Sequence, residues 1–359
     1  MSKTPPLFQA NRIRLLSLLL LLAPALATAQ KSLPPLPAPQ DVPYAGPSTR
    51  TVYSPRAIVP GGIVIPLYPP DSPLLNQERK GEAEKYTLSE AVPGRITNVV
   101  NVHNPSIEIH KADARANTGA VVIVAPGGGH RTLVIGSEGA DVVPYFYNYG
   151  VNTVILRNRL RVDGYEPRTD AVHDALQAVR MVRAYAEELH FDPHKIGIMG
   201  FSAGAELSAP AAVEFADFDK NNKAADDPFA GITSRPDFVG IIYPGPSPFA
   251  ANRSPHPSIP PNAPPAFIAT AGSGDKVHAV WAMEYFSAML NVGLPNIEMH
   301  IYGNGKHGGA LTDRGGIPFG TWPDRYIDWL RDLGFLNPPG VETKAARDVA
   351  EYVANPPKK

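Results

Sequence analysis

A serine lies in the middle of the pentapeptide Gly200-Phe201-Ser202-Ala203-Gly204, directly after the segment 195–199, a run that is apolar from Ile196 onward. The run predicts a buried strand, and a stretch of helical character follows the pentapeptide. A chain that passes from strand to helix through so few residues makes a tight turn, which requires neighbours with very small side chains. Gly200 and Gly204 allow that close approach, and Ala203 keeps the far side small. The segment therefore predicts a sharp turn that raises the Ser202 hydroxyl above the edge of a sheet.

Strand and helix patterns alternate along the chain from about residue 85. Residues 106–110 alternate apolar and polar side chains, as in a half-exposed strand, and the apolar run at 119–125 predicts a strand buried on both faces. Further strands are expected at 152–156, 195–199, 238–242, 266–270 and 298–302, and helices between 167 and 189, around 280–289 and over 322–333. This alternation predicts the α/β fold class, with a mostly parallel central sheet and helices on both faces.

The first 29 residues have the pattern of a signal peptide. Lys3, Arg12 and Arg14 precede an apolar run at 15–22, and Ala27-Thr28-Ala29 forms a cleavage site before Gln30. The apolar run is shorter than the ~20 residues that a membrane-spanning helix needs, so we expect no stable membrane anchor. The chain is therefore predicted to be exported, either to the periplasm or to the medium.

Three further segments are expected after the signal peptide. Residues 30–84 are crowded with proline, which fixes φ and removes a hydrogen-bond donor, so an extended linker is predicted there. Residues 85–336 carry the alternating pattern and are expected to form the main domain. Residues 337–359 are a polar tail to which the sequence assigns no structure.

The composition excludes several kinds of chemistry. The chain has 359 residues and no cysteine, which rules out disulfides, thiolate metal sites and a cysteine nucleophile. The formal net charge is −1 and no long basic run occurs, so no nucleic-acid partner is expected. His190 and His194 have a metal-ligand spacing on a helix, but Pro193 would break that helix, so we expect no metal and no cofactor. The oligomeric state stays open.

A serine hydroxyl becomes a useful nucleophile when a base removes its proton. His307 lies in the glycine-rich segment 303–309, just after the last expected strand, and is the predicted base. His278, His256 and His300 are the other histidines considered. His300 lies inside an expected strand and His256 in a proline-rich segment, which makes both poorer choices.

The acid that orients this histidine should follow the penultimate strand. Asp275 does so, and it lies between Ser202 and His307 in the chain, in the order expected for serine, acid and histidine. It would hold the imidazole tautomer and stabilise the imidazolium ion. The alternative for Asp275 is a turn or helix-capping aspartate, because Gly-Asp is also found in turns.

Three glycines follow the buried strand at 119–125, in the run Pro126-Gly127-Gly128-Gly129-His130. Unshielded backbone N–H groups are what a tetrahedral oxyanion requires. An amide of Gly128 or Gly129 could join that of Ala203 to form such an oxyanion hole. A phosphate-binding loop is the alternative, but the lysine and the glycine spacing that it needs are absent.

Over about residues 95–335 the chain resembles α/β-hydrolase serine esterases of the acetylxylan-esterase-like group, which are related to hormone-sensitive-lipase-type esterases. The resemblance rests on Pro126-Gly127-Gly128-Gly129-His130, Ser137-Glu138-Gly139, the Ser202 pentapeptide, Gly274-Asp275 and Lys306-His307-Gly308. It implies the α/β-hydrolase fold, a triad of Ser202, Asp275 and His307, and removal of acetyl or other short acyl groups from plant polysaccharides or their fragments. The expected partner is then a small ester or an acetylated polysaccharide.

Some residues depart from this group or have uncertain roles. His130 stands where an aromatic residue is usual, and Arg157-Asn158-Arg159-Leu160-Arg161 replaces a more usual Tyr-Arg-Leu. These arginines could bind an acidic sugar, but we expect a solvated loop paired with Asp163 and Glu166. Glu138 could lie beside the substrate pocket or cap a helix that starts near Asp141, and the capping role is favoured.

Two other functions remain open from the sequence. One is a serine peptidase of the prolyl-oligopeptidase type, although that family has a large gating domain before the hydrolase core. The other is a binding protein that keeps the fold without catalysis, although such relatives usually lose the nucleophile, the histidine or the glycines.

Overall fold

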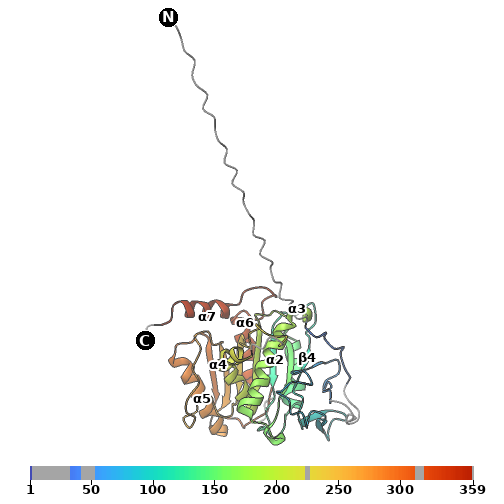
Figure 1. Cartoon of the computed structure of the whole chain (residues 1–359). Coiled ribbons are helices and arrows are strands. Elements are labelled where there is room, and N and C mark those ends of the chain that lie inside the picture. Colours follow the sequence, from blue (N-terminus) through green and yellow to red (C-terminus); the bar gives the residue numbers. More distant parts are fainter. Residues whose placement is uncertain (2–32, 42–52, 223–226, 312–318, 358–359) are drawn as a thin grey trace. The chain divides into compact units, whose positions relative to one another are not determined.

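The computed structural model describes Met1 and residues 33–41, 53–222, 227–311 and 319–357 (Figure 1). Apart from Met1, the predicted signal peptide lies outside the described residues. Residues from Leu33 to Lys359 form one compact unit. In the described part of the chain, no helix combines the length and the apolar character needed to cross a bilayer.

A central sheet of eight strands carries the fold. Its order is β1-β4-β6-β5-β7-β8-β9-β10, and all neighbours from β6 to β10 run parallel, whereas β1 and β4 form an antiparallel edge. The strands are β1 (Ile63–Pro66), β4 (Ser106–His110), β5 (Val121–Ala125), β6 (Asn152–Arg157), β7 (Ile196–Phe201), β8 (Phe238–Ile242), β9 (Ala266–Ala271) and β10 (Ile297–Tyr302). The predicted mostly parallel sheet is confirmed. Parallel strands bring their carboxyl ends to one edge, where the loops after β5, β7, β9 and β10 meet.

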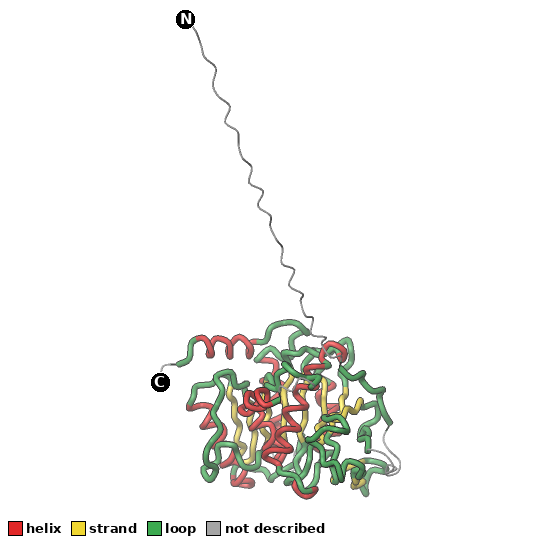
Figure 2. Tube along the Cα trace, viewed as in Figure 1, coloured by secondary structure: helices red, strands yellow, loops and turns green. Residues whose placement is uncertain are grey.

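Helices cover both faces of this sheet, as predicted. The long helices α2 (Val172–Ala184), α4 (Ala205–Asn221) and α5 (Lys276–Asn291) lie side by side on one face (Figures 1 and 2). The other face is covered by α1 (Val142–Tyr147) and α6 (Trp322–Asp332). A short helix, α3 (Ala186–Leu189), follows α2 directly.

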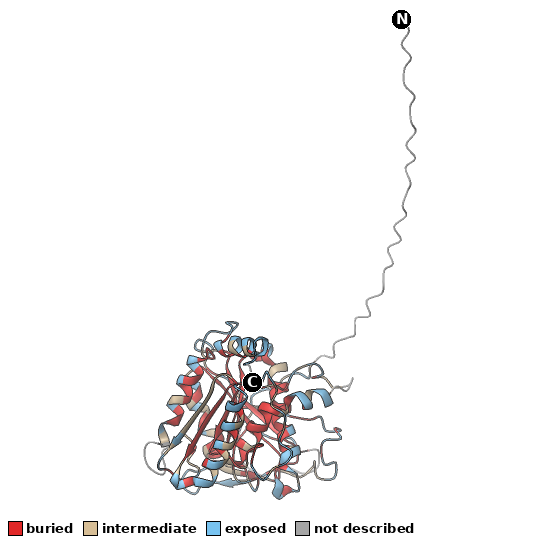
Figure 3. Ribbon diagram, turned by 90° about the vertical axis from the view of Figure 1, so that its left-hand side faces the viewer, coloured by how far each residue is buried: buried red, intermediate tan, exposed pale blue. Residues whose placement is uncertain are grey.

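The hydrophobic core fills the space on both sides of the sheet (Figure 3). Along β5, Val121 and Ile123 pack with the α2, α4 and α5 layer, whereas Val122 and Val124 pack with the α1 and α6 layer. All four are fully buried. Each such side chain contributes roughly 1.5–3 kcal/mol through burial. A continuous apolar run is therefore what this two-sided position requires.

The prediction of a linker over 30–84 is wrong for its second half. β1 belongs to the central sheet, where it pairs antiparallel with β4. Tyr53 is buried and its hydroxyl donates to Glu84, a carboxylate that also pairs with Arg157 of β6. Proline is compatible with this position because β1 lies at the edge of the sheet. Some backbone N–H groups of an edge strand point to solvent and need no partner in the sheet.

A two-stranded sheet of β2 (Lys85–Leu88) and β3 (Ile96–Val100) lies between β1 and β4 in the chain. Val99 of β3 also forms a bridge to Leu133, in the segment after the three glycines. In the tail at 337–359, residues Lys344–Ala354 form an amphipathic helix, α7, whose Ala345 and Val349 are buried. The sequence had assigned no structure to this tail.

Candidate active site

Ser202 lies at the turn between β7 and α4, with a left-handed φ of 52°. Both flanking glycines are required by close backbone contacts. A Cβ on Gly200 would lie 2.1 Å from the Gly204 carbonyl oxygen, and one on Gly204 would lie 1.9 Å from the Ala125 oxygen of β5. The predicted turn is therefore present. Its strain is accommodated by packing against the neighbouring strand, and it presents the Ser202 hydroxyl at the carboxyl edge of the sheet.

The three residues expected to form a triad are in contact. Ser202 Oγ lies 2.8 Å from His307 Nε2, and His307 Nδ1 lies 2.8 Å from Asp275 Oδ2. Because a carboxylate only accepts hydrogen bonds, Nδ1 carries the proton and Nε2 is free to accept the serine proton. A Cβ on Gly274 would lie 1.7 Å from the Gly305 oxygen, so a glycine there lets the Asp275 and His307 loops meet.

Two aromatic side chains hold the ring of His307. Tyr243, at the end of β8, meets it edge to face, with centroids 5.1 Å apart and planes at 72°. His278 stacks on it, with centroids 3.7 Å apart and planes at 23°. His278 Nδ1 also lies 2.5 Å from Asp275 Oδ1. The base is thus fixed by ring packing as well as by its hydrogen bonds.

Glu138 lies on the short helical turn Gly136–Ala140, but it does not cap the next helix. Its Oε2 accepts the N–H of Gly127 at 2.7 Å, and its Oε1 accepts the hydroxyl of Tyr243 at 2.9 Å. Burial raises the pKa of this carboxyl group. The capping prediction is wrong because the carboxyl group points into the protein, where it ties the first glycine of the loop to the tyrosine that packs on His307.

The loop after β5 places its glycines beside the serine. A Cβ on Gly127 would lie 2.9 Å from Ser202 Cβ, and residues 126 and 127 share a small space with Ala203. Within the described residues, no protein acceptor receives the N–H of Gly128 or Gly129. Free N–H groups beside the serine have the chemistry of an oxyanion hole.

Comparison with solved structures identifies the fold. An acetyl ester-xyloside bifunctional hydrolase from Caldicellulosiruptor lactoaceticus superposes with a TM-score of 0.58 and 24% identity, covering 76% of this chain and 97% of that one. The chain has the α/β-hydrolase fold. Residues 107–241, from β4 to β8 and including the Ser202 turn, match the BD-FAE family model.

Two curated relatives of this α/β-hydrolase are esterase or xylan-degrading proteins by name. Acetylxylan esterase from Xylanibacter ruminicola is 28% identical over 263 residues, which are 70% of this chain and 50% of that protein. Endo-1,4-beta-xylanase B from Butyrivibrio fibrisolvens is 33% identical over 137 residues, 38% of this chain and 20% of that protein. The chain thus spans half or less of the length of these relatives. The resemblance to acetylxylan-esterase-like α/β-hydrolases is confirmed.

The arginines at the end of β6 and just after it do not form a solvated loop, and the structure corrects that prediction. Arg157 is fully buried and lies 3.1 Å from Glu84, and the buried Arg159 lies 2.8 Å from Asp174 of α2. Of the three, Arg161 is exposed. The expected partners were local in sequence, whereas the actual ones lie on other elements of the fold. Arg157 and Arg159 therefore connect segments of this α/β-hydrolase and do not face a substrate.

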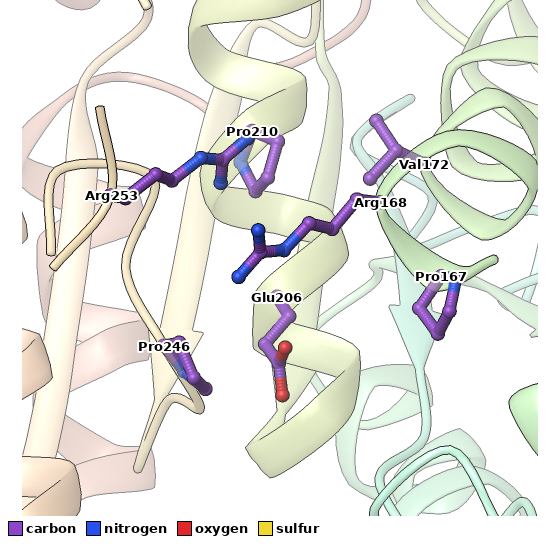
Figure 4. A pocket seen from close by; sticks show the side chains of 7 residues that line it. All are labelled: Pro167, Arg168, Val172, Glu206, Pro210, Pro246 and Arg253. Carbon is purple, nitrogen blue, oxygen red and sulfur yellow. The ribbon is translucent and has the colours of Figure 1, made fainter. Parts of the chain in front are cut away.

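A polar hollow lies beside the first turns of α4, the helix that follows Ser202 in the chain (Figure 4). The backbone N–H of Gly245 donates to the Ser202 carbonyl oxygen at 3.2 Å, which ties the segment that carries Pro246 to the backbone of the nucleophile. Arg168 and Arg253 extend from opposite sides toward the space over Glu206, which lies on the first turn of α4. The lining thus combines cationic donors, a carboxylate acceptor and apolar proline rings. It consists of Pro167, Arg168, Val172, Glu206, Pro210, Pro246 and Arg253.

The sequence considered His278 only as a rival of His307, and its contact with Asp275 was missed. The i,i+3 spacing from Asp275 at a helix start could have indicated it.

Asp275, His278 and His307 bring metal-ligating atom types within 4.8 Å of one another. However, the Nδ1 atoms of both histidines are engaged with the two carboxylate oxygens. Hydrogen bonding accounts for this cluster without a metal ion. The other two histidines lie elsewhere: His256 contacts the Ala250 oxygen, and His300 contacts Glu298.

Proposed function

We propose that this α/β-hydrolase is a serine carboxylic-ester hydrolase that removes acetyl or other short acyl groups from plant polysaccharides or their fragments. The observation that carries the proposal is the hydrogen-bonded chain from Ser202 through His307 to Asp275 at the carboxyl edge of the sheet. The names of the relatives, an acetylxylan esterase among them, support the substrate class.

The geometry suits acyl transfer through a covalent intermediate. Ser202 Oγ attacks the ester carbonyl carbon while His307 Nε2 takes the hydroxyl proton, and Asp275 stabilises the resulting imidazolium. The negative oxygen that forms would accept from the amides of Ala203 and of Gly128 or Gly129. The carbon–oxygen bond to the alcohol then breaks as His307 returns its proton to that alcohol. Water, deprotonated by His307, attacks the acyl-serine and releases the acid and free Ser202.

The hollow over Glu206 has room for about one water molecule, so it offers contact groups for the edge of a sugar alcohol and does not enclose one. Arg168 and Arg253 can donate to sugar oxygens, and Glu206 can accept from hydroxyl groups. Pro167, Pro210 and Pro246 provide apolar contact for the C–H faces of a ring. The most direct test is acetate release from acetylated xylan, pectin and mannan by the purified protein. Cleavage of prolyl peptides without acetate release would favour a peptidase instead.

A short acyl preference is predicted from the packing beside the glycine loop. His130, Leu160 and Leu207 line the space next to Ala203, and that space is too small for a water molecule. A long acyl chain would find no apolar site there to gain the ~0.8 kcal/mol per methylene that burial provides. We expect kcat/KM for p-nitrophenyl acetate to exceed that for the octanoate ester at least about tenfold. Faster octanoate hydrolysis would contradict the acyl-chain assignment.

We further propose that the protein is exported, because the segment 1–29 has the arrangement of a cleaved signal peptide. When the full-length gene is expressed in a bacterial host, the mature protein is expected outside the cytoplasm with Gln30 as its first residue. Fractionation and mass spectrometry of the intact protein measure both. Recovery of an uncleaved chain from the cytoplasm would refute the proposal, and deleting residues 2–29 provides the matched control.

A further inference from the structure

The carboxylate of Asp275 holds two histidines, and the proposed reaction uses one of them. Oδ2 is bound by His307 at 2.8 Å and Oδ1 by His278 at 2.5 Å. We propose that His278 is a positioning residue for the base: its Nδ1–H fixes the second oxygen of Asp275, and its ring supports the ring of His307. This inference rests on the ester-hydrolase function proposed above.

Local geometry on α5 places His278 in this position. Asp275 is the residue before the helix and His278 lies one turn later, so its side chain can reach back to the carboxylate. Trp281, a further turn along, packs edge to face on His278, with centroids 5.2 Å apart and planes at 86°. His278 is therefore held on one side by Trp281 and contacts His307 with its ring face.

The hydrogen bonds determine the protonation of both rings. A carboxylate oxygen can only accept, so each Nδ1 donates to Asp275. Three charged or titratable groups act on His278: Asp275 on the preceding turn, His307 on the loop after β10, and Glu206 on α4. Burial lowers the pKa of His278, and so does the nearby His307. Asp275 and Glu206 act to raise this pKa, but the net effect is a lowered value. With its pKa lowered and Nδ1 facing the carboxylate, we expect His278 to be an uncharged ring at neutral pH with its proton on Nδ1.

An uncharged ring at this place serves the reaction in two ways. When His307 takes the proton of Ser202 it becomes a cation, and a neutral stacked ring can accommodate that charge, whereas an imidazolium would repel it. Asp275 is 7% exposed in its side chain, and a donor on Oδ1 keeps the carboxylate oriented with Oδ2 toward His307.

Two substitutions separate the donor from the ring. His278→Asn keeps an N–H donor near the Nδ1 position but loses the ring, and His278→Phe keeps the ring and loses the donor. We expect H278F to lower kcat for p-nitrophenyl acetate about tenfold with little change in KM, the size of effect that a lost hydrogen bond to a charged group produces. In H278F the pKa of the acidic limb of kcat/KM should rise, because Asp275 then acts on His307 alone. H278N should stay within about threefold of the wild type, with its acidic limb unmoved.

His194→Phe is the matched control, since His194 is exposed before β7 at the opposite end of the sheet. An unchanged kcat and pH profile in H278F would overturn the proposal. Equal losses of kcat in H278F and H278N, without a shift of the acidic limb of kcat/KM, would also overturn it.

Proton NMR of the ¹⁵N-histidine-labelled wild type gives a test that needs neither variant nor activity. Protons are expected on the Nδ1 atoms of both His278 and His307, each hydrogen-bonded to Asp275, and an unprotonated His278 Nδ1 would refute the assignment. If the wild type hydrolyses no ester, the proposed function fails, but this spectrum still tests whether His278 donates to Asp275.

Discussion

Ser202→Ala is expected to lower kcat for acetate-ester hydrolysis by about 10⁴-fold or more, as loss of the nucleophile does in serine hydrolases. The substitution removes the Oγ that lies 2.8 Å from His307 Nε2, so no acyl-serine can form. Alanine is smaller than serine and leaves the turn intact, so the folded state should persist. Initial rates with p-nitrophenyl acetate, together with the melting temperature, measure both effects.

An exposed serine provides the control for this substitution. Ser258→Ala removes the same atom from the loop between β8 and β9 and should leave kcat unchanged. Mass spectrometry after reaction with an organophosphonate should show one adduct on the wild type and none on S202A. Undiminished turnover by S202A would refute the nucleophile assignment and, with it, the proposed function.

Arg157→Met is expected to lower the free energy of unfolding by about 3–5 kcal/mol, because one partner of a buried ion pair is removed. Arg157 lies between two buried carboxylates, 3.1 Å from Glu84 and 3.9 Å from Glu108. Burial by itself lowers the pKa of Arg157, but these two carboxylates outweigh it and hold the pKa above its usual value. Without the guanidinium, Glu84 would lose its cation in the protein interior. Urea unfolding followed by fluorescence measures the change.

Arg161→Met is the matched control, because Arg161 is exposed in the same segment. Its effect should stay within about 0.5 kcal/mol, as is usual for surface substitutions. Equal stabilities of the two variants would mean that the buried network around Glu84 does not contribute as the structure indicates. A large loss confined to R157M would support the conclusion that the segment before residue 85 is part of the folded domain.

The fold and the order of the site residues were predictable because they depend on local pattern. Fully apolar runs such as 121–125 occur where a strand is covered on both faces, and the glycines around Ser202 occur where two backbones approach closely. Asp275 and His307 could be chosen because parallel strands bring their carboxyl ends to one edge. Their catalytic roles remain predictions that the experiments above test.

Apart from the linker predicted over 30–84, the errors concern side chains with partners that are distant in sequence. Glu138 was expected to serve its own helix, yet it binds Gly127 and Tyr243. Arg157 was expected in solvent, yet it binds Glu84, 73 residues away. A charged residue has the same local pattern whether it is solvated or buried with a partner, and burial is set by how the elements pack.

The Ser202 turn shows what the sequence alone determined about this protein: a strand, a turn and a helix that present a serine, with an acid and a histidine in the right order. The tertiary structure decided how that serine is supported. Only packing brings Gly274 against Gly305, stacks His278 on His307 and directs Glu138 to the glycine loop. The physical reason is that backbone patterning is a local property. Orientation of a catalytic side chain instead depends on contacts between loops that close only when the whole sheet has formed.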